Sequence, residues 1–133
     1  MQAEYIIPRE HALAALDAVA ALGPELKDLI LISEVRTVAA DELAASPFCR
    51  RASVCVHFTL RKRPEAVTAL LPKIEAALGP FAPRPHWGKL FTMPREPLWA
   101  NYAGAGLGEY RSLLRARDPH GKFANAFLRE YIL

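Results

Sequence analysis

The stretch ILISEVRTVAADEL, residues 30–43, begins as an apolar strand and then carries two opposite charges, Glu34 and Arg36. Side chains of a β-strand alternate between faces, so these two point the same way, and Ile30, Ile32 and Val38 are expected on the same face. Opposite charges side by side can hydrogen-bond a polar ligand. They can also form an ordinary exposed ion pair, which stabilises a fold only slightly.

Thr59 and Lys89 can join this pair if neighbouring strands carry them. Residues 53–61 alternate cleanly, and Cys55, His57 and Thr59 are expected opposite an apolar face of Val54, Val56, Phe58 and Leu60. Lys89 would come from a third strand, where Gly88 allows a backbone or ligand to approach closely. The candidate site is therefore Glu34, Arg36, Thr59 and Lys89, and spacing alone leaves an exposed sheet face with charge pairs as the alternative.

Other patterns that could carry chemistry are weaker. The segment AGAGLG, residues 103–108, lacks the spacing of a dinucleotide loop and does not follow a strand, so we interpret it as the lead-in to a helix. The four histidines lack metal-ligand spacing, and no metal is predicted. Cys55 and His57 could form a nucleophilic pair, but no orienting group is visible, so an unreactive thiol is favoured.

The elements that must position the four candidates follow from periodicity. Strands are expected over residues 4–7, 29–38, 53–61 and 84–91, with a helix over 9–22 that stops at Gly23-Pro24. A second helix, 64–78, carries a buried stripe of Val67, Leu70, Leu71, Ile74 and Leu78, and Pro72 should kink it. Helices are expected from Leu98 onward, with one stripe of Tyr110, Leu113 and Leu114 and a closing set of Phe123, Phe127, Leu128 and Tyr131. The β-α-β-β-α-β order predicts an α+β, ferredoxin-like antiparallel sheet with helices on one face and a helical C-terminal tail.

Composition limits the class of protein. The 133 residues fit one domain, 1–133, and the net charge of +3 is too mild and too scattered for a nucleic-acid surface. No segment is apolar for long enough to span a bilayer, and the N-terminus does not resemble a signal peptide, so a cytoplasmic protein with no membrane partner is expected. A ferredoxin-like order also occurs in RNA-recognition motifs, but SVCVHFTL lacks the aromatic and glycine pattern that stacks bases.

Four segments, SEVRTVAADELAASPF, VHFTL, PRPHWGKLF and DPHGKFANAFL, resemble in this order the C-terminal substrate domain of alditol (xylitol-type) oxidases. These enzymes belong with the sugar-lactone oxidases, such as D-arabinono-1,4-lactone oxidase, of the vanillyl-alcohol oxidase flavoenzyme superfamily. The resemblance extends from about Glu4 to Tyr131. It implies a polyol or sugar-lactone pocket against a flavin, with Glu34, Arg36, Thr59 and Lys89 as substrate-binding groups. Of these, Lys89, Arg36 and Glu34 would act in catalysis, with Lys89 as the proton acceptor and Glu34 orienting both cations.

The resemblance also implies what this chain does not carry. The family has an N-terminal FAD-binding domain, which supplies most dinucleotide contacts and is absent from this chain, so we expect a single substrate-binding (cap) domain. Such a chain is not expected to bind FAD or to be active alone. It should bind a flavin domain or self-associate. The alternative is a non-catalytic ligand-binding or protein-interaction module with a ferredoxin-like fold.

Overall fold

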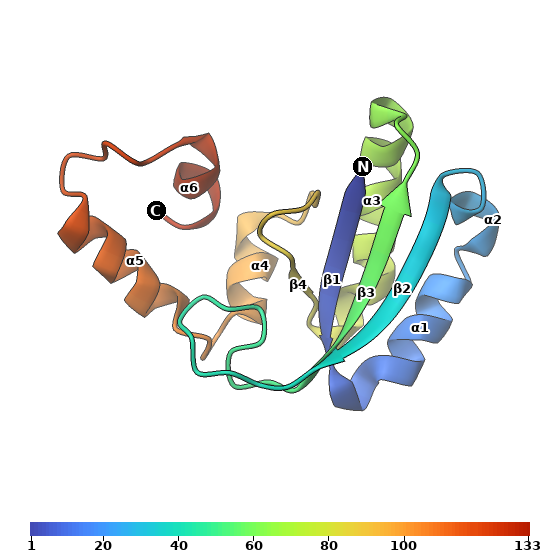
Figure 1. Cartoon of the computed structure of the whole chain (residues 1–133), viewed down its shortest axis with the longest axis horizontal. Helices are drawn as coiled ribbons and strands as arrows, with labels where there is room; N and C mark the ends of the chain where they lie inside the picture. The colour runs from blue at the N-terminus through green and yellow to red at the C-terminus, as the bar shows by residue number, and fades with distance from the viewer.

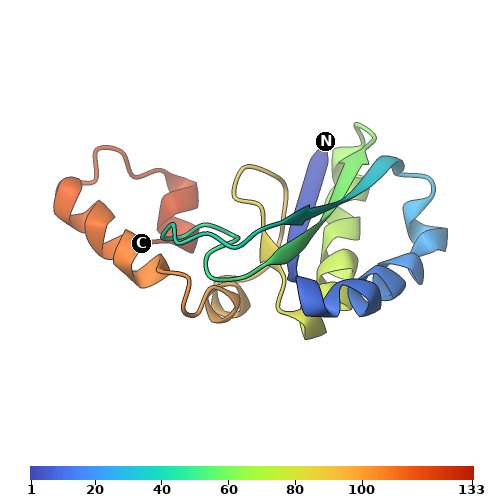
Figure 2. The same cartoon turned by 60° about the horizontal axis from the view of Figure 1, so that its bottom comes forward.

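The computed structural model, which describes all 133 residues, contains a four-stranded antiparallel sheet with helices against one face (Figures 1 and 2). The strands are β1 (Gln2–Pro8), β2 (Ile30–Val38), β3 (Ser53–Leu60) and β4 (Arg84–Pro85), in the order β2-β3-β1-β4. Helix α1 (Ala12–Ala20) follows β1 and helix α3 (Pro64–Leu78) follows β3. The predicted α+β class and the β-α-β-β-α-β order are confirmed.

The main core lies between the sheet and these two helices. Alternate residues of β1 and β3, among them Tyr5 and Phe58, pack against a buried stripe of α3 that consists of Val67, Leu70, Leu71, Ile74 and Leu78. This is the stripe that the sequence predicts. Helix α3 continues through Pro72, whose exposed position lets the chain tolerate the missing N–H without ending the helix. Because the core takes up one face of each strand, only the opposite face remains for other contacts.

Strand β2 contains an irregularity that changes one prediction. Ile30 pairs with Leu60 and Ile32 with Thr59, so two residues of β2 advance for one of β3, as in a β-bulge. Ile30 therefore packs on the helix-side core, whereas Ile32 lies on the open face and is 56% exposed. The expectation that Ile30 shares a face with Ile32 is wrong, because the inserted residue interrupts the alternation of side chains between the two faces.

Two segment predictions also need correction. Gly23-Pro24 ends the first helical segment, but it also begins a short helix, α2 (Gly23–Leu26), since proline fits the first helical turn. The predicted strand 84–91 shortens to the two residues of β4. Beyond Pro85 the chain turns, as the amide of Lys89 donates to the His86 carbonyl at 3.0 Å. Lys89 therefore comes from a loop and not from a strand.

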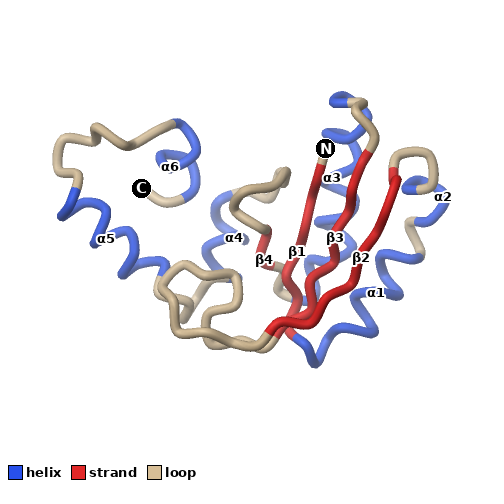
Figure 3. Tube along the Cα trace, viewed as in Figure 1, coloured by secondary structure: helices blue, strands red, loops and turns tan.

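The C-terminal third packs separately from the main core. Helices α4 (Arg95–Asn101), α5 (Leu107–Arg117) and α6 (Ala126–Tyr131) lie beyond β4, and the long loop 39–52 runs from the sheet towards them (Figures 1 and 3). They form a second, smaller core that includes Leu98, Tyr102 and Ile132. Tyr110 and Leu114 pack on it as predicted, but Leu113 and Phe123 are exposed. Two 3₁₀ turns, η1 (Arg9–His11) and η2 (Gly79–Phe81), complete the chain, and none of its helices has the length and apolarity to cross a membrane.

Candidate substrate-binding site

The face of the sheet that no helix covers carries a row of polar side chains. Antiparallel register places Glu4 of β1 opposite His57 of β3, and His57 opposite Glu34 of β2. Arg36 lies beside Cys55 and Ile32 beside Thr59 on the same face. Three of the four predicted site residues, Glu34, Arg36 and Thr59, thus lie on one surface because they occupy alternate positions of neighbouring strands.

The centre of this row is Glu4, which the sequence analysis did not single out. Its side chain is buried, and the residue is only 5% exposed. One carboxylate oxygen, Oε2, contacts Lys89 Nζ and lies 3.2 Å from His57 Nδ1, while the other, Oε1, lies 3.4 Å from a guanidinium nitrogen of Arg36. A carboxylate this deep in a fold has to be paired, and here it has three partners.

A signal for Glu4 was present in the sequence. The stretch AEYIIP reads as a strand in which Ala3, Tyr5 and Ile7 share one face, so Glu4 must point to the other. If this strand lies beside the one that carries His57, Glu4 falls on the polar face. The sequence does not state that adjacency, which is the reason the residue was missed.

The cluster is balanced in charge. Glu4 and Glu34 are matched by Arg36 and Lys89, and Arg36 bridges both carboxylates. Burial alone would raise the pKa of Glu4, but the hydrogen bond from Lys89 and its charge, together with the nearby His57, outweigh it and hold the pKa below the ordinary value of 4.5. Glu4 is therefore ionised at neutral pH.

Lys89 reaches this face from the loop after β4. Its Nζ atom contacts Glu4 and lies 3.0 Å from His57 Nδ1, and its side chain is 16% exposed. Lys89 makes no ion pair with Glu34, because β1 and β3 lie between β4 and β2 in the sheet. The arrangement expected from the sequence, one carboxylate serving both cations, is thus divided: Glu34 pairs with Arg36, and Glu4 links Arg36 to Lys89.

His57 and Thr59 continue the cluster along β3. His57 lies on the face where it was expected, but it is only 2% exposed, and its Nε2 atom lies 3.2 Å from Thr59 Oγ1. Cys55, two residues earlier, is buried, and this burial together with the nearby Glu4 charge raises its pKa to about 11. A thiol with so high a pKa stays protonated at neutral pH, so it is no activated nucleophile.

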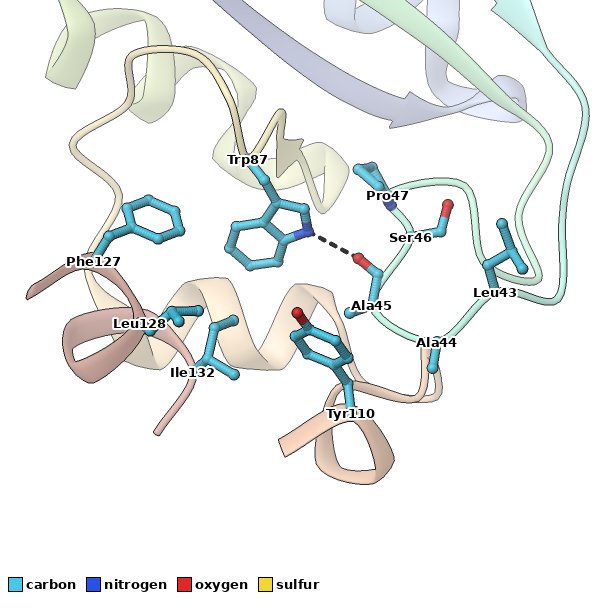
Figure 4. A pocket seen from close by; sticks show the side chains of 10 residues that line it. All are labelled: Leu43, Ala44, Ala45, Ser46, Pro47, Trp87, Tyr110, Phe127, Leu128 and Ile132. Carbon is cyan, nitrogen blue, oxygen red and sulfur yellow. Dashed lines mark hydrogen bonds between the residues drawn. The ribbon is translucent and has the colours of Figure 1, made fainter. Parts of the chain in front are cut away.

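Two hollows are lined in part by residues 87–90 of the loop after β4. A shallow one of about 450 Å³ is lined by Met1, Gln2, Gly88, Lys89 and Leu90. A second cavity, of about 410 Å³, is mostly apolar and lies between loop 39–52, Trp87 and helices α5 and α6 (Figure 4). There the indole N–H of Trp87 donates to the Ala45 carbonyl at 2.8 Å. None of the charged residues of the cluster lines this apolar cavity.

The glycine segment 103–108 forms the turn between α4 and α5. Gly104 and Gly106 have positive φ angles, and a Cβ atom at Gly106 would come within 3.1 Å of Ala44. These glycines serve the turn and the close packing of loop 39–52, as expected for a lead-in to a helix. The described chain also holds no group of three His, Cys, Asp or Glu residues arranged for a metal ion.

Comparison with known proteins agrees with this geometry. A curated relative, an alditol oxidase from a Streptomyces species, is 46% identical over 132 residues, which are 99% of this chain and 31% of that protein. The chain thus spans about a third of the relative's length and matches its C-terminal part. A family model described as D-arabinono-1,4-lactone oxidase matches residues 1–131. From its first strand to its last helix, the chain therefore belongs to the D-arabinono-1,4-lactone oxidase family.

Proposed function

We propose that this chain is the substrate-binding domain of an FAD-dependent oxidase that acts on the CH–OH group of an alditol or a sugar lactone. The observation that carries the proposal is the charge-balanced cluster of Glu4, Glu34, Arg36 and Lys89 on a sheet face that no helix covers. An ion-pair network built only for stability would not need to leave donors and acceptors open to one side. Membership of the sugar-lactone oxidase family supports the same conclusion.

The exposed parts of the cluster fit a polyol. Arg36 and Glu34 have side chains that are 45% and 42% exposed, so a rigid fork of donors and a carboxylate acceptor both face outward. Lys89 offers a compact cation beside the hollow at Gly88. Thr59 adds a hydroxyl on the same face. Adjacent hydroxyl groups of a sugar alcohol would find a donor or an acceptor at each step along this row.

The same face also fits one side of a flavin ring. Ile32 presents an exposed apolar side chain on the same face as the exposed guanidinium of Arg36, with Glu34 between them along β2, and a flat ring with polar edges can pack across such a row. The redox chemistry, hydride uptake from the substrate and reoxidation by oxygen to give hydrogen peroxide, would be supplied by flavin when it is bound in the complete enzyme. The residues of this chain orient the substrate and do not supply the redox chemistry.

The proposed roles follow from charge and reach. Arg36 and Lys89 hydrogen-bond the hydroxyl that is oxidised and stabilise its alkoxide character as hydride leaves the carbon. Lys89 takes the hydroxyl proton, since an arginine keeps all its protons in proteins. Glu34 orients Arg36 and accepts from a neighbouring hydroxyl, while Thr59 binds a more distant one.

A chimera tests this function. In it, the chain replaces the matched C-terminal part of the Streptomyces alditol oxidase, and flavin content is measured first. We expect peroxide formation with pentitols or hexitols, or with sugar lactones, and much weaker turnover of a simple primary alcohol that lacks the further hydroxyls. A correctly folded, flavin-loaded chimera that oxidises none of them would favour a non-catalytic ligand-binding or interaction module.

The purified chain alone should be colourless. Its glycine segment is a helix-to-helix turn, and the flavin contacts of the family are expected from another domain. A visible absorption spectrum checks this directly. Flavin absorbance at one equivalent per chain would show that these 133 residues bind the cofactor by themselves, and the division of labour between two domains would be wrong.

A further inference from the structure

Three atoms of the cluster lie within mutual hydrogen-bonding reach. Lys89 Nζ contacts Glu4 Oε2 and lies 3.0 Å from His57 Nδ1, and His57 Nδ1 lies 3.2 Å from the same Glu4 oxygen. On its other side, His57 Nε2 is 3.2 Å from Thr59 Oγ1. His57 is therefore bonded through both ring nitrogens, and neither the polyol-binding roles nor the packing of the core requires that arrangement.

The chemistry of these atoms allows one continuous order of donors. An ammonium has three N–H groups and no lone pair, so Lys89 can donate to Glu4 Oε2 and to His57 Nδ1 at once. In that order Nδ1 is unprotonated, and the ring proton lies on Nε2, which donates to Thr59 Oγ1. The Thr59 hydroxyl hydrogen is left free to donate to a ligand. Hydrogen bonds are then donated in one direction through the cluster: Lys89 donates to His57, and His57 donates to Thr59.

We propose that a proton relay runs from the substrate hydroxyl through Lys89 to His57, which accepts the proton at the end. Glu4 is the positioning residue that holds the side chains of Lys89 and His57 in place. This inference deepens the proposed function and rests on it for the identity of the substrate. A Lys89 ammonium cannot accept a proton unless it gives one up. His57 Nδ1 is a neutral acceptor 3.0 Å away that can take it.

The step balances without a further reactant. The substrate O–H bond breaks and its proton joins Lys89 Nζ, while one Nζ proton passes to His57 Nδ1; the hydride that leaves the carbon would be taken up by the flavin of the complete enzyme. The imidazolium so formed lies beside the Glu4 carboxylate. The other titratable groups that face it are Cys55 on its own strand and the Glu34–Arg36 pair on β2. Glu4 is the carboxylate that lies against the ring, 3.2 Å from Nδ1, so it is the counter-ion.

Nitrogen NMR of the histidine rings tests the hydrogen-bond order in the chain alone, without flavin or activity. We expect His57 to carry its proton on Nε2, with Nδ1 unprotonated. In Lys89→Met the ammonium donor is lost, and the proton should move to Nδ1, where it donates to Glu4. His11 and His120, both exposed, serve as internal references. A resting His57 protonated on Nδ1, or no change of tautomer in Lys89→Met, would overturn the proposed order.

Kinetics in the flavin-loaded chimera test the proton transfer itself. His57→Gln should lower kcat by about 10²-fold or more with KM within a few-fold, as for loss of a positioned acid–base group, and His120→Gln should change neither. Glu4→Gln should move the acid limb of the kcat–pH profile to lower pH, because an imidazolium loses its counter-ion. An unchanged kcat in a folded His57→Gln enzyme would refute the relay while leaving the proposed function intact. Failure of the proposed function would instead appear in the parent chimera, as flavin without polyol oxidation.

Discussion

The sheet region and the C-terminal helical region are held together in different ways. In the first, 15 buried residues form one core between regular strands and the long helix α3. In the second, a core of 8 residues joins short helices, and specific polar contacts fasten them to the rest. Arg84, buried at the end of the sheet, donates to the carbonyls of Pro47, Cys49 and Asn101 and so ties loop 39–52 to α4.

The difference explains where each kind of site lies. The charged cluster needs side chains held at fixed separations, and neighbouring strands in register provide them. The apolar cavity of Figure 4 needs only a hollow between a loop and packed aromatic rings, such as Trp87 and Phe127, whose ring centroids are 6.2 Å apart. We infer that the catalytic side chains lie in the sheet region, and that the helical region forms one side of the molecule.

The largest expected effect is a loss of stability, and it should differ between the two cores. Ile74→Ala, in the main core, should lower the free energy of unfolding by about 2–5 kcal/mol and reduce hydrogen-exchange protection throughout β1 and β3. Leu98→Ala, in the second core, should lose protection mainly in α4 to α6 and leave the sheet amides close to the parent values. Both residues are fully buried, so the two variants are matched.

Hydrogen exchange measured by NMR or mass spectrometry distinguishes the outcomes. If Leu98→Ala opened the sheet as readily as Ile74→Ala does, the two regions would form one cooperative unit.

An intermediate effect is expected for the stability that Glu4 contributes as the pH is lowered. Because the folded-state pKa of Glu4 is lowered, its carboxylate adds stability that is complete above the ordinary pKa of 4.5 and is lost as pH falls through the folded value. Glu4→Gln should therefore be less stable than the parent at pH 7, by about 1–3 kcal/mol, and the difference should shrink on acidification. Denaturant unfolding between pH 7 and pH 3 measures this. Glu130→Gln, at an exposed position, is the control, and a difference independent of pH would contradict the pairing of Glu4.

The smallest expected effect tests the outer end of the cluster. Thr59→Val removes one hydroxyl contact and should mainly raise the KM for a polyol in the chimera, by an amount equivalent to about 0.5–1.5 kcal/mol. Thr37→Val makes the same change on β2, at a position paired with Val54 on the other face, and should leave KM unchanged. A fall in kcat with unaltered KM would mean that Thr59 acts in the chemical step and not in distal binding.

Much of the sheet region could be predicted because each segment there shows a clear period. Alternation in β3 and the stripe of α3 both follow directly from burial on one side. The resemblance to known motifs then identified Glu34, Arg36, Thr59 and Lys89, and the structure brings all four to one face or its border.

Other features depend on contacts between distant segments. The bulge between Ile30 and Ile32 is a property of pairing with β3, and the sequence of β2 alone does not reveal it. Glu4 joins the cluster because β1 lies between β3 and β4, and its three partners are 32, 53 and 85 residues away in the chain. The short helices α2 and α4 escaped exact prediction because proline and glycine signal a helix start as well as a stop.

We propose that the sheet face binds and activates the substrate, and turnover of Lys89→Met in the flavin-loaded chimera distinguishes that role from a face that only carries ion pairs. Steady-state turnover on a polyol should fall by about 10²–10⁴-fold in kcat, because the proton acceptor at the reacting hydroxyl is lost. Lys62→Met, at an exposed lysine beyond the end of β3, should turn over like the parent. If Lys89→Met, with full flavin content, turns over within a few-fold of the parent enzyme, the cluster is only an exposed set of ion pairs and the account is wrong.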